Sequence, residues 1–152
     1  MILYFDDLAV GMRMETQGRT ITEADVVNFA GVSGDYNPLH MDAEFAKTTP
    51  FGQRIAHGLL VLSVVTGLRQ HLKLMEGAVL AFLEIRSWRF RKPVFIGDTI
   101  RARTEITGLR PTSNPERGIV TVAAQVFNQH GDVVQEGELV FMVRRKPAAQ
   151  AG

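Results

Sequence analysis

The segment 33–42 (SGDYNPLHMD) places an acid, an amide and an imidazole within a few residues of one another. Asp35 and His40 are five residues apart, with Asn37 between them. A carboxylate and an imidazole that lie close together can accept and deliver a proton, as general acid-base catalysis requires. The segment therefore predicts a catalytic pair that adds water to, or removes it from, a carbon–carbon double bond conjugated to a carbonyl.

A second chemical feature lies at His57 and Gly58, where the longest apolar run of the chain begins. The first N–H groups of a helix lack intrahelical partners and carry partial positive charge. Gly58 has no side chain, so a ligand can approach its N–H closely. A thioester carbonyl held there would be polarised as in an oxyanion hole. The pair Asp35 and His40 would then act on an activated substrate.

Each of these residues also has an ordinary structural interpretation. An aspartate in a loop is usually a turn former or a helix cap, and a single histidine is usually a satisfied hydrogen-bonding residue. The grouping of Asp35, Asn37 and His40 ahead of His57 and Gly58 favours a site over those interpretations.

Other reaction classes lack their motifs. The chain has no nucleotide-phosphate motif and no H-E-x-x-H, and its four histidines show no metal-ligand spacing. Residues 31–35 (GVSGD) do not form the G-x-S-x-G elbow of a serine hydrolase. We therefore expect neither a metal nor a cofactor.

Composition indicates a globular domain with no strong electrostatic partner. The 152 residues carry a net charge of +1, with 45% hydrophobic and 22% charged residues. The chain has no cysteine, which excludes disulfides and thiol nucleophiles and fits a reducing compartment. Asp6 and Asp7 stand where a signal peptide would be basic. The apolar run 58–68 is too short to cross a bilayer. We expect a cytoplasmic protein that binds neither nucleic acid nor membrane.

Helical patterns occupy the first half of the chain. Residues 22–25 (TEAD) resemble a capping box, which predicts a helix over 23–32. Pro38 pushes Asn37 out of helical geometry, so the segment that follows is expected not to form a regular helix. Asp42 caps a brief helix, and the apolar pattern predicts a long helix over 55–75. Small residues share one face of this helix, where a sheet or a ligand would pack closely: Ser63, Thr66 and Gly67.

Strand patterns occupy the second half. Period-two alternation is clearest over 100–107, and 78–90, 118–127 and 133–143 also indicate strands. We expect an α+β fold in which a long antiparallel sheet wraps around the apolar helix. One helix cannot cover both the sheet and its own far side, so we expect a dimer. The prediction is one domain over 1–146 and a disordered tail over 147–152.

The motif segment 29–60 (FAGVSGDYNPLHMDAEFAKTTPFGQRIAHGLL) closely resembles the hydratase motif of MaoC-like dehydratases, the (R)-specific enoyl-CoA hydratases. Residues 91–99 (RKPVFIGDT) resemble a second block of this family, and 6–12 and 20–30 are also similar to it. The resemblance implies a hot-dog fold and a homodimer or a dimer-based assembly. It also implies that Asp35 and His40 are the catalytic dyad.

The resemblance implies roles for further residues. Asn37 would help to hold the substrate or water, and the Gly58 N–H would bind the thioester oxygen. Thr66 stands where family members often carry a serine that hydrogen-bonds in the site. His57 and Ser63 are supporting candidates, His57 as a brace for the loop.

The implied reaction is reversible hydration of a trans-2-enoyl-CoA to an (R)-3-hydroxyacyl-CoA without metal or redox cofactor. Coenzyme A is the carrier part of the substrate, and an acyl carrier protein could replace it. A basic cluster offers contacts to the coenzyme A phosphates, although most of its members are expected to be a solvated strand face. Its members are Arg86, Arg89, Arg91, Lys92, Arg101 and Arg103.

Three alternatives remain open. A hot-dog thioesterase would hydrolyse acyl-CoA, although it does not need this dyad segment. A non-catalytic acyl-thioester binding subunit would be expected to lose the dyad, and this chain keeps both members. Nucleic-acid binding through the arginine-rich strands is disfavoured by the near-zero net charge.

Overall fold

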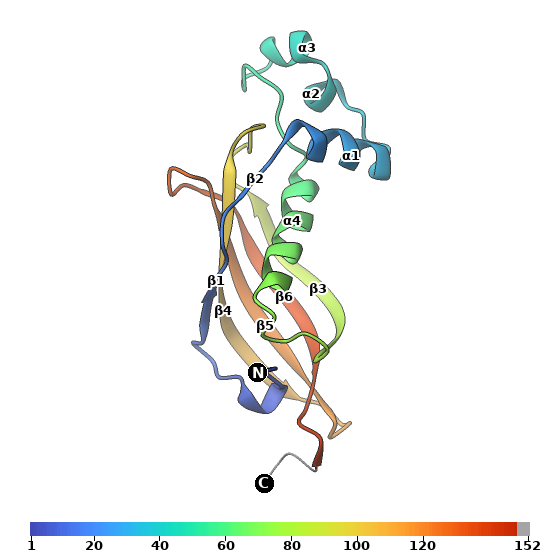
Figure 1. Cartoon of the computed structure of the whole chain (residues 1–152), viewed down its shortest axis with the longest axis vertical. Helices are drawn as coiled ribbons and strands as arrows, with labels where there is room; N and C mark the ends of the chain where they lie inside the picture. Colours follow the sequence, from blue (N-terminus) through green and yellow to red (C-terminus); the bar gives the residue numbers. More distant parts are fainter. Residues whose placement is uncertain (149–152) are drawn as a thin grey trace.

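The computed structural model describes residues 1–148, and Figure 1 shows a long curved sheet with one helix along its inner face. Of the predicted tail 147–152, residues 149–152 lie outside the described part. The sheet order is β1-β4-β5-β6-β3, with β2 also pairing with β4. All of these pairings are antiparallel: β1 (Arg13–Glu15), β2 (Arg19–Thr20), β3 (Val79–Phe90), β4 (Thr99–Pro111), β5 (Arg117–Phe127) and β6 (Val133–Arg144).

The four long strands confirm the predicted strands, and the α+β architecture is the predicted one. β1 and β2 were not predicted, because segments of three and two residues are too short to show alternation. A short 3-10 turn, Phe5–Asp7, precedes them.

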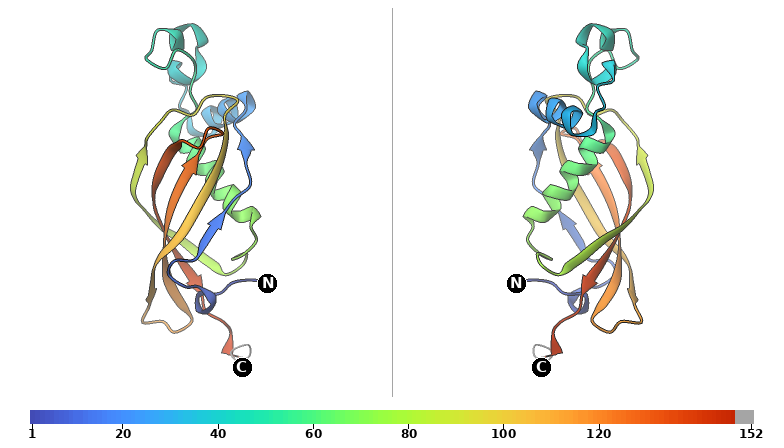
Figure 2. Two further views of the ribbon diagram at one scale, coloured as in Figure 1. Left: turned by 90° about the vertical axis from the view of Figure 1, so that its left-hand side faces the viewer. Right: turned by 90° about the vertical axis from the view of Figure 1, so that its right-hand side faces the viewer.

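The central helix α4 (Gly58–His71) lies against the inner face of the sheet (Figures 1 and 2). The predicted helix over 55–75 is therefore wrong at both ends. Ile55 forms a bridge with Phe95 and the Ala56 N–H donates to the Val94 carbonyl, so these residues are extended before the helix. After His71 the chain turns, and Lys73 adopts a positive φ of 53°.

Apolar side chains of α4 and the sheet form the core. One side of α4 is buried against strand residues such as Ile100, Ala102 and Val126. The helix contributes Leu60, Val61, Leu62, Val64, Val65 and Leu68. Burying a side chain of this size stabilises the fold by about 1.5–3 kcal/mol. This packing therefore holds α4, and with it Gly58 at its first position, against the sheet.

Three short helices before α4 gather at one end of the sheet (Figure 2). They are α1 (Glu23–Ser33), α2 (Pro38–Met41) and α3 (Ala43–Lys47). The capping box at Thr22 and Asp25 is present, and Gly34 ends α1 with a φ of 74°. Asp42 caps α3 as predicted.

The expectation of an irregular segment around Pro38 is wrong in part. Pro38 begins the one-turn helix α2, which carries His40. Proline is compatible with the first turn of a helix because its missing N–H would have no intrahelical partner there. Asn37 stays outside the helix and caps it, as its expected non-helical geometry requires.

The edge strand β3 exposes large apolar side chains. It lies at one end of the sheet order and, within residues 1–148, pairs with β6 alone. The outer face of α4, with Leu59, Ser63 and Thr66, is also exposed. The exposed apolar residues of β3 are Val79, Leu80, Phe82, Leu83, Ile85 and Phe90. Within residues 1–148, no helix is long and apolar enough to span a membrane.

Candidate active site

The predicted pair lies at the end of the sheet where α1, α2 and the start of α4 meet. His40 Nε2 is 4.0 Å from Asp35 Oδ2. The imidazole is buried, whereas the Asp35 side chain is 52% exposed. The Asp35 Oδ1 accepts from the Asn37 N–H at 3.2 Å, which closes the turn ahead of α2. The folded chain therefore presents an accessible carboxylate next to a buried imidazole.

Backbone contacts fix the orientation of His40. Its Nδ1 lies 2.7 Å from the Ile55 carbonyl oxygen. Since a carbonyl only accepts, Nδ1 carries the proton, and the Nε2 that faces Asp35 is the atom that can gain or lose one. Arg54 Nε donates to the His40 carbonyl at 2.6 Å, and its guanidinium also pairs with Glu23 of α1. Arg54 thus ties α2 to α1.

His57 lies between the pair and the core. Its Nε2 is 2.9 Å from the Asp35 carbonyl oxygen and must therefore donate to it. Its ring stacks on His40 with centroids 3.8 Å apart, and Phe29 packs against it at 4.9 Å. His57 Nδ1 is buried and has no hydrogen-bond partner among the described residues. His57 is therefore a bridge between Asp35 and His40, consistent with the expected brace.

Gly58 is the first residue of α4, and Gln135 and Phe90 contact it. Its carbonyl accepts from Gln135 Nε2 of β6 at 3.0 Å, and Gln135 in turn accepts from Trp88 Nε1 at 3.0 Å. A side chain at this position would meet the Phe90 ring at 2.5 Å. No backbone acceptor for the Gly58 N–H occurs in the part of the chain that the structure describes. That N–H is available to a ligand, as an oxyanion donor must be.

A pocket of about 380 Å³ opens beside His40 and Gly58, and Asp35 is not among its lining residues. His40 and Gly58 line it together with the apolar side chains Leu59, Phe90 and Val94. Such a pocket suits a thioester whose reacting end lies beside His40.

The fold places the members of the predicted basic cluster in different parts of the structure. Arg91 and Lys92 line the pocket, and each also pairs with an acid of β6 or the turn before it, Glu136 and Asp132. By contrast, Arg101 and Arg103 both pair with Glu15 and lie on β4, away from this pocket. Arg86 pairs with Glu84 on its own strand.

Asn37 lies beside Asp35 but uses its side chain as a helix cap, and Ser63 and Thr66 lie away from the pair. The Asn37 Oδ1 accepts from the Leu39 N–H and so caps α2. Ser63 and Thr66 donate to carbonyls within α4, those of Leu59 and Ser63. Thr66 lines a different pocket, farther along the helix.

The ligand atoms of Asp35, His40 and His57 lie within 4.8 Å of one another, a spacing that could accommodate a metal ion. Hydrogen bonds to backbone carbonyls occupy one nitrogen of each ring. This donor set therefore offers a metal at most the remaining nitrogens and one carboxylate. The same contacts serve acid-base chemistry directly, because they hold His40 Nε2 toward Asp35.

Sequence reasoning missed Gln135, Trp88 and the bracing role of Arg54. Gln135 and Trp88 reach the site from β6 and β3, and no local pattern marks a strand residue whose partner is 77 positions away. Arg54 lies inside the recognised motif, yet its contacts to α1 and α2 depend on the packing of three helices.

The fold and site define an α+β domain with an acid-base pair at a helix start. Residues 7–127 match the family model described as MaoC like domain. The chain belongs to this family.

Two curated relatives and one solved structure are similar to it. The 3-hydroxybutyryl-CoA dehydratase of Methylorubrum extorquens is 38% identical, covering 97% of this chain and 88% of the relative. The (R)-specific enoyl-CoA hydratase of Rhodospirillum rubrum is also 38% identical, covering 92% and 91%. A Mycobacterium tuberculosis protein with a double hot-dog fold superimposes with a TM-score of 0.85 at 25% identity, covering 99% of this chain and 47% of that one. The hot-dog fold is the architecture expected from the motif.

Proposed function

We propose that this chain is a hydro-lyase that reversibly hydrates a trans-2-enoyl-CoA to an (R)-3-hydroxyacyl-CoA. The observation that carries the proposal is the 4.0 Å separation of His40 Nε2 and Asp35 Oδ2 beside an available helix-start N–H. The relatives whose names specify enoyl-CoA hydration and 3-hydroxybutyryl-CoA dehydration support the same reaction.

The separation of the pair suits one water molecule that donates to Asp35 and accepts from the Nε2–H of His40. In the hydration direction, Asp35 takes a proton from this water as the water oxygen bonds to C3. His40, protonated on both nitrogens, gives its Nε2 proton to C2. Transfer of the proton from Asp35 to His40 restores the starting state. Both new bonds form on one face of the alkene because a single pair serves both.

Charge that develops on the thioester oxygen during attack would be stabilised by the Gly58 N–H. The aligned peptide dipoles of α4 favour negative charge at this end of the helix. The contact from Gln135 to the Gly58 carbonyl fixes the orientation of the peptide that follows Gly58. Removing one such donor typically lowers the rate by roughly 10²–10³-fold.

The reaction needs no cofactor, since the thioester already activates the alkene. Coenzyme A would be the carrier, with an acyl carrier protein as the other possible carrier. Arg91 and Lys92 at the pocket are our candidates for contacts to its phosphates. We place the enzyme in the cytoplasm, where acyl-CoA is available and a chain without cysteine needs no oxidising compartment.

We further propose that the enzyme works as a homodimer in which a second copy covers β3 and the outer face of α4. A free edge strand with exposed apolar side chains is a template for pairing with another strand. Covering that edge would also enclose the space between α4 and β3.

The direct test is loss of the enoyl-thioester absorbance when purified protein meets crotonyl-CoA. We expect rapid loss with the wild type and a fall of roughly 10²–10⁴-fold in both Asp35→Asn and His40→Gln. Chiral analysis of the product tests the (R) assignment. Release of free thiol in place of hydration would indicate a thioesterase, and no turnover of any enoyl thioester would indicate a binding subunit.

A further inference from the structure

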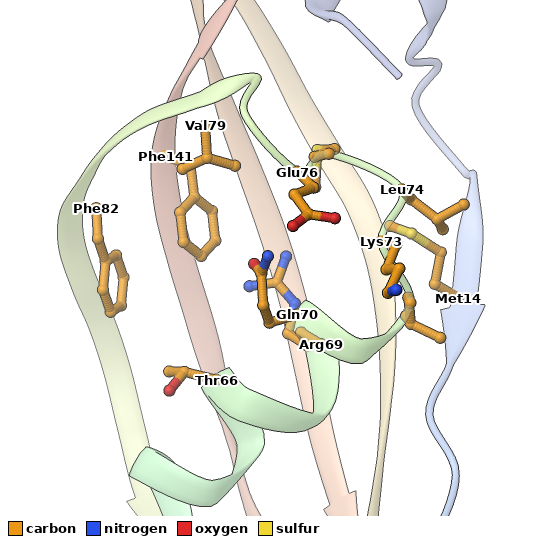
Figure 3. Close-up of a pocket in the computed structure, with 12 residues that line it drawn as sticks. Met14, Thr66, Arg69, Gln70, Lys73, Leu74, Glu76, Val79, Phe82 and Phe141 are labelled. Carbon is orange, nitrogen blue, oxygen red and sulfur yellow. The ribbon is translucent and has the colours of Figure 1, made fainter. Parts of the chain in front are cut away.

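A second pocket lies between α4 and β3, toward the other end of the helix from the acid-base pair. It has a volume of about 190 Å³ and is lined by Thr66, Arg69, Val79, Phe82 and Phe141, among others. Figure 3 shows these side chains around the last turns of α4. The first pocket opens between Gly58 and Phe90, which belong to the same helix and the same strand. The two pockets therefore lie toward opposite ends of α4 and β3.

Arg69 is the unusual member of the second pocket. Its guanidinium lies over the Phe141 ring, 4.6 Å from the centroid. Burial lowers the pKa of Arg69 to about 10, so the group is still a cation at neutral pH. Among residues 1–148, no acceptor forms a hydrogen bond or an ion pair with this side chain.

A cation withdrawn from water without an anionic partner is unfavourable, and stacking on an aromatic ring compensates for only part of the loss. A carboxylate suits the planar guanidinium, which can donate two parallel hydrogen bonds to it. The pocket thus combines apolar walls, Phe82, Phe141 and Val79, with the partly buried Arg69 cation, and the exposed Lys73 also lines it. Those are the features that a hydrocarbon chain with a terminal carboxylate requires.

The position of Arg69 relative to Gly58 indicates which part of the substrate would reach it. Eleven residues separate the two, which is roughly 16 Å along a helix axis. An acyl chain whose thioester oxygen is at Gly58 can run along the space between α4 and β3 toward Arg69. The coenzyme A phosphates extend from the other side of the thioester. They carry several charges, and a small pocket with two phenyl rings suits them poorly.

We propose that Arg69 binds a carboxylate at the far end of the acyl group, so that the preferred substrates are enoyl thioesters of dicarboxylic acids. This inference rests on the proposed hydratase function. It names a substrate class and leaves the acid-base chemistry at Asp35 and His40 unchanged.

The chain itself has one other source of a carboxylate at this pocket. Glu76 follows α4 and lines the same pocket, and Figure 3 shows its carboxylate turned toward the end of the helix where Arg69 and Gln70 lie. Glu76 forms no ion pair with Arg69 among the described residues. A contact with Glu76 in solution would fill the role assigned to the substrate, so the experiment includes Glu76→Gln.

The experiment compares kcat/KM for trans-2-dodecenoyl-CoA and trans-2-dodecenedioyl-CoA, which are long enough to approach Arg69 from Gly58 and differ only in the terminal carboxylate. We expect the wild type to prefer the dicarboxylic substrate. Arg69→Met should lower kcat/KM for that substrate by about 10- to 100-fold, the usual loss of a charge-assisted hydrogen bond, and change the neutral substrate by less than about 2-fold. Arg69→Lys should retain part of the preference. Arg110→Met, which removes an exposed cation of β4 that lines neither pocket, is the matched control and should change neither value.

The possible failures are distinguishable. Turnover of neither substrate by the wild type would contradict the proposed function itself. Turnover of both with no preference for the carboxylate, or a preference that survives Arg69→Met, would overturn the role of Arg69 alone. If Glu76→Gln greatly strengthens binding of the dicarboxylic substrate, the internal acid competes for the same guanidinium, which supports the site. If Arg69→Met lowers thermal stability or dissociates the dimer while the preference persists, Arg69 is structural and the proposal is wrong.

Discussion

His40 and His57 hold each other's segments in place. Their rings stack at 3.8 Å, His40 donates to the carbonyl of Ile55, and His57 donates to the carbonyl of Asp35. Each ring thus binds the backbone just ahead of the other. The two hydrogen bonds join the segment before α2 to the segment before α4, and so bring the acid-base pair to the start of the central helix.

The reciprocal contact predicts a catalytic defect when the His57 hydrogen bond is removed. His57→Phe keeps an aromatic ring for stacking but cannot donate to the Asp35 carbonyl. We expect kcat to fall by about 10²-fold with little change in KM, because Asp35 shifts while the pocket walls remain. Steady-state kinetics on crotonyl-CoA measure both values.

His130→Phe is the control, since that histidine is exposed in the turn between β5 and β6. A His57→Phe variant with normal kcat would show that Asp35 is positioned by other contacts.

A glycine at position 58 could be needed for either of two reasons, close packing of the Phe90 ring or approach of the substrate to the Gly58 N–H. The variant Gly58→Ala, alone and combined with a change at Phe90, distinguishes them. The added methyl would meet the Phe90 ring at 2.5 Å, and overpacking of this kind costs about 1–3 kcal/mol of stability. Chemical denaturation should show this loss in the single variant and its recovery in the double variant Gly58→Ala, Phe90→Leu.

If substrate approaches the Gly58 N–H, the double variant should regain stability while kcat/KM stays low. Full recovery of activity in the double variant would mean that glycine is needed only to accommodate Phe90.

The exposed edge of β3 predicts a change in oligomeric state. Ile85 is 47% exposed on this strand, and a lysine there would place a charge in the interface that we propose between two copies. Sedimentation velocity should show a dimer for the wild type and a monomer for Ile85→Lys. Val32→Lys, which alters an apolar residue that is 88% exposed on α1, should leave the dimer intact. A wild-type monomer that is fully active would rule out the dimer as the working unit.

The ion pair between Asp7 and Lys146 predicts a pH dependence of stability. Lys146 Nζ lies 2.6 Å from Asp7 Oδ1. This hydrogen bond lowers the pKa of Asp7 below 3.8 and raises the pKa of Lys146 above 10.5. Because the pKa of Asp7 is lower in the folded state, its ionised carboxylate stabilises the fold at pH values above the pKa of the unfolded state. This contribution is lost as the pH falls through the pKa of the folded state. Because the pKa of Lys146 is higher in the folded state, its charge stabilises the fold at pH values below the pKa of the unfolded state. This stabilisation is lost as the pH rises through the pKa of the folded state.

We therefore expect the coupling free energy of unfolding between Asp7→Asn and Lys146→Met to be constant through the neutral pH range. This coupling should fade below about pH 4 and above about pH 10. Urea denaturation of the wild type, both single variants and the double variant measures this coupling. A coupling that is unchanged at pH 2 would contradict the assignment of the effect to the Asp7 carboxylate.

The amino-acid sequence by itself determined the order and type of the main elements and the chemistry of the site. Local signals suffice where a pattern repeats along the chain. The alternation in β4, the apolar stretch of α4 and the capping box at Thr22 all predicted elements that the structure contains. The motif also named Asp35, His40 and Gly58, which the fold brings to one end of the sheet.

The tertiary structure alone decided how these residues are held and what else surrounds them. Gln135 reaches Gly58 from β6, and Phe141 lies beneath Arg69 of α4, in each case across more than 70 positions of sequence. Arg69 follows the apolar run 58–68 in the sequence, and nothing in that pattern marks it as a buried cation. Its burial without a partner depends on how α4 packs on β6 and β3. Contacts of this kind arise from packing between distant segments, and no periodicity within one segment encodes them.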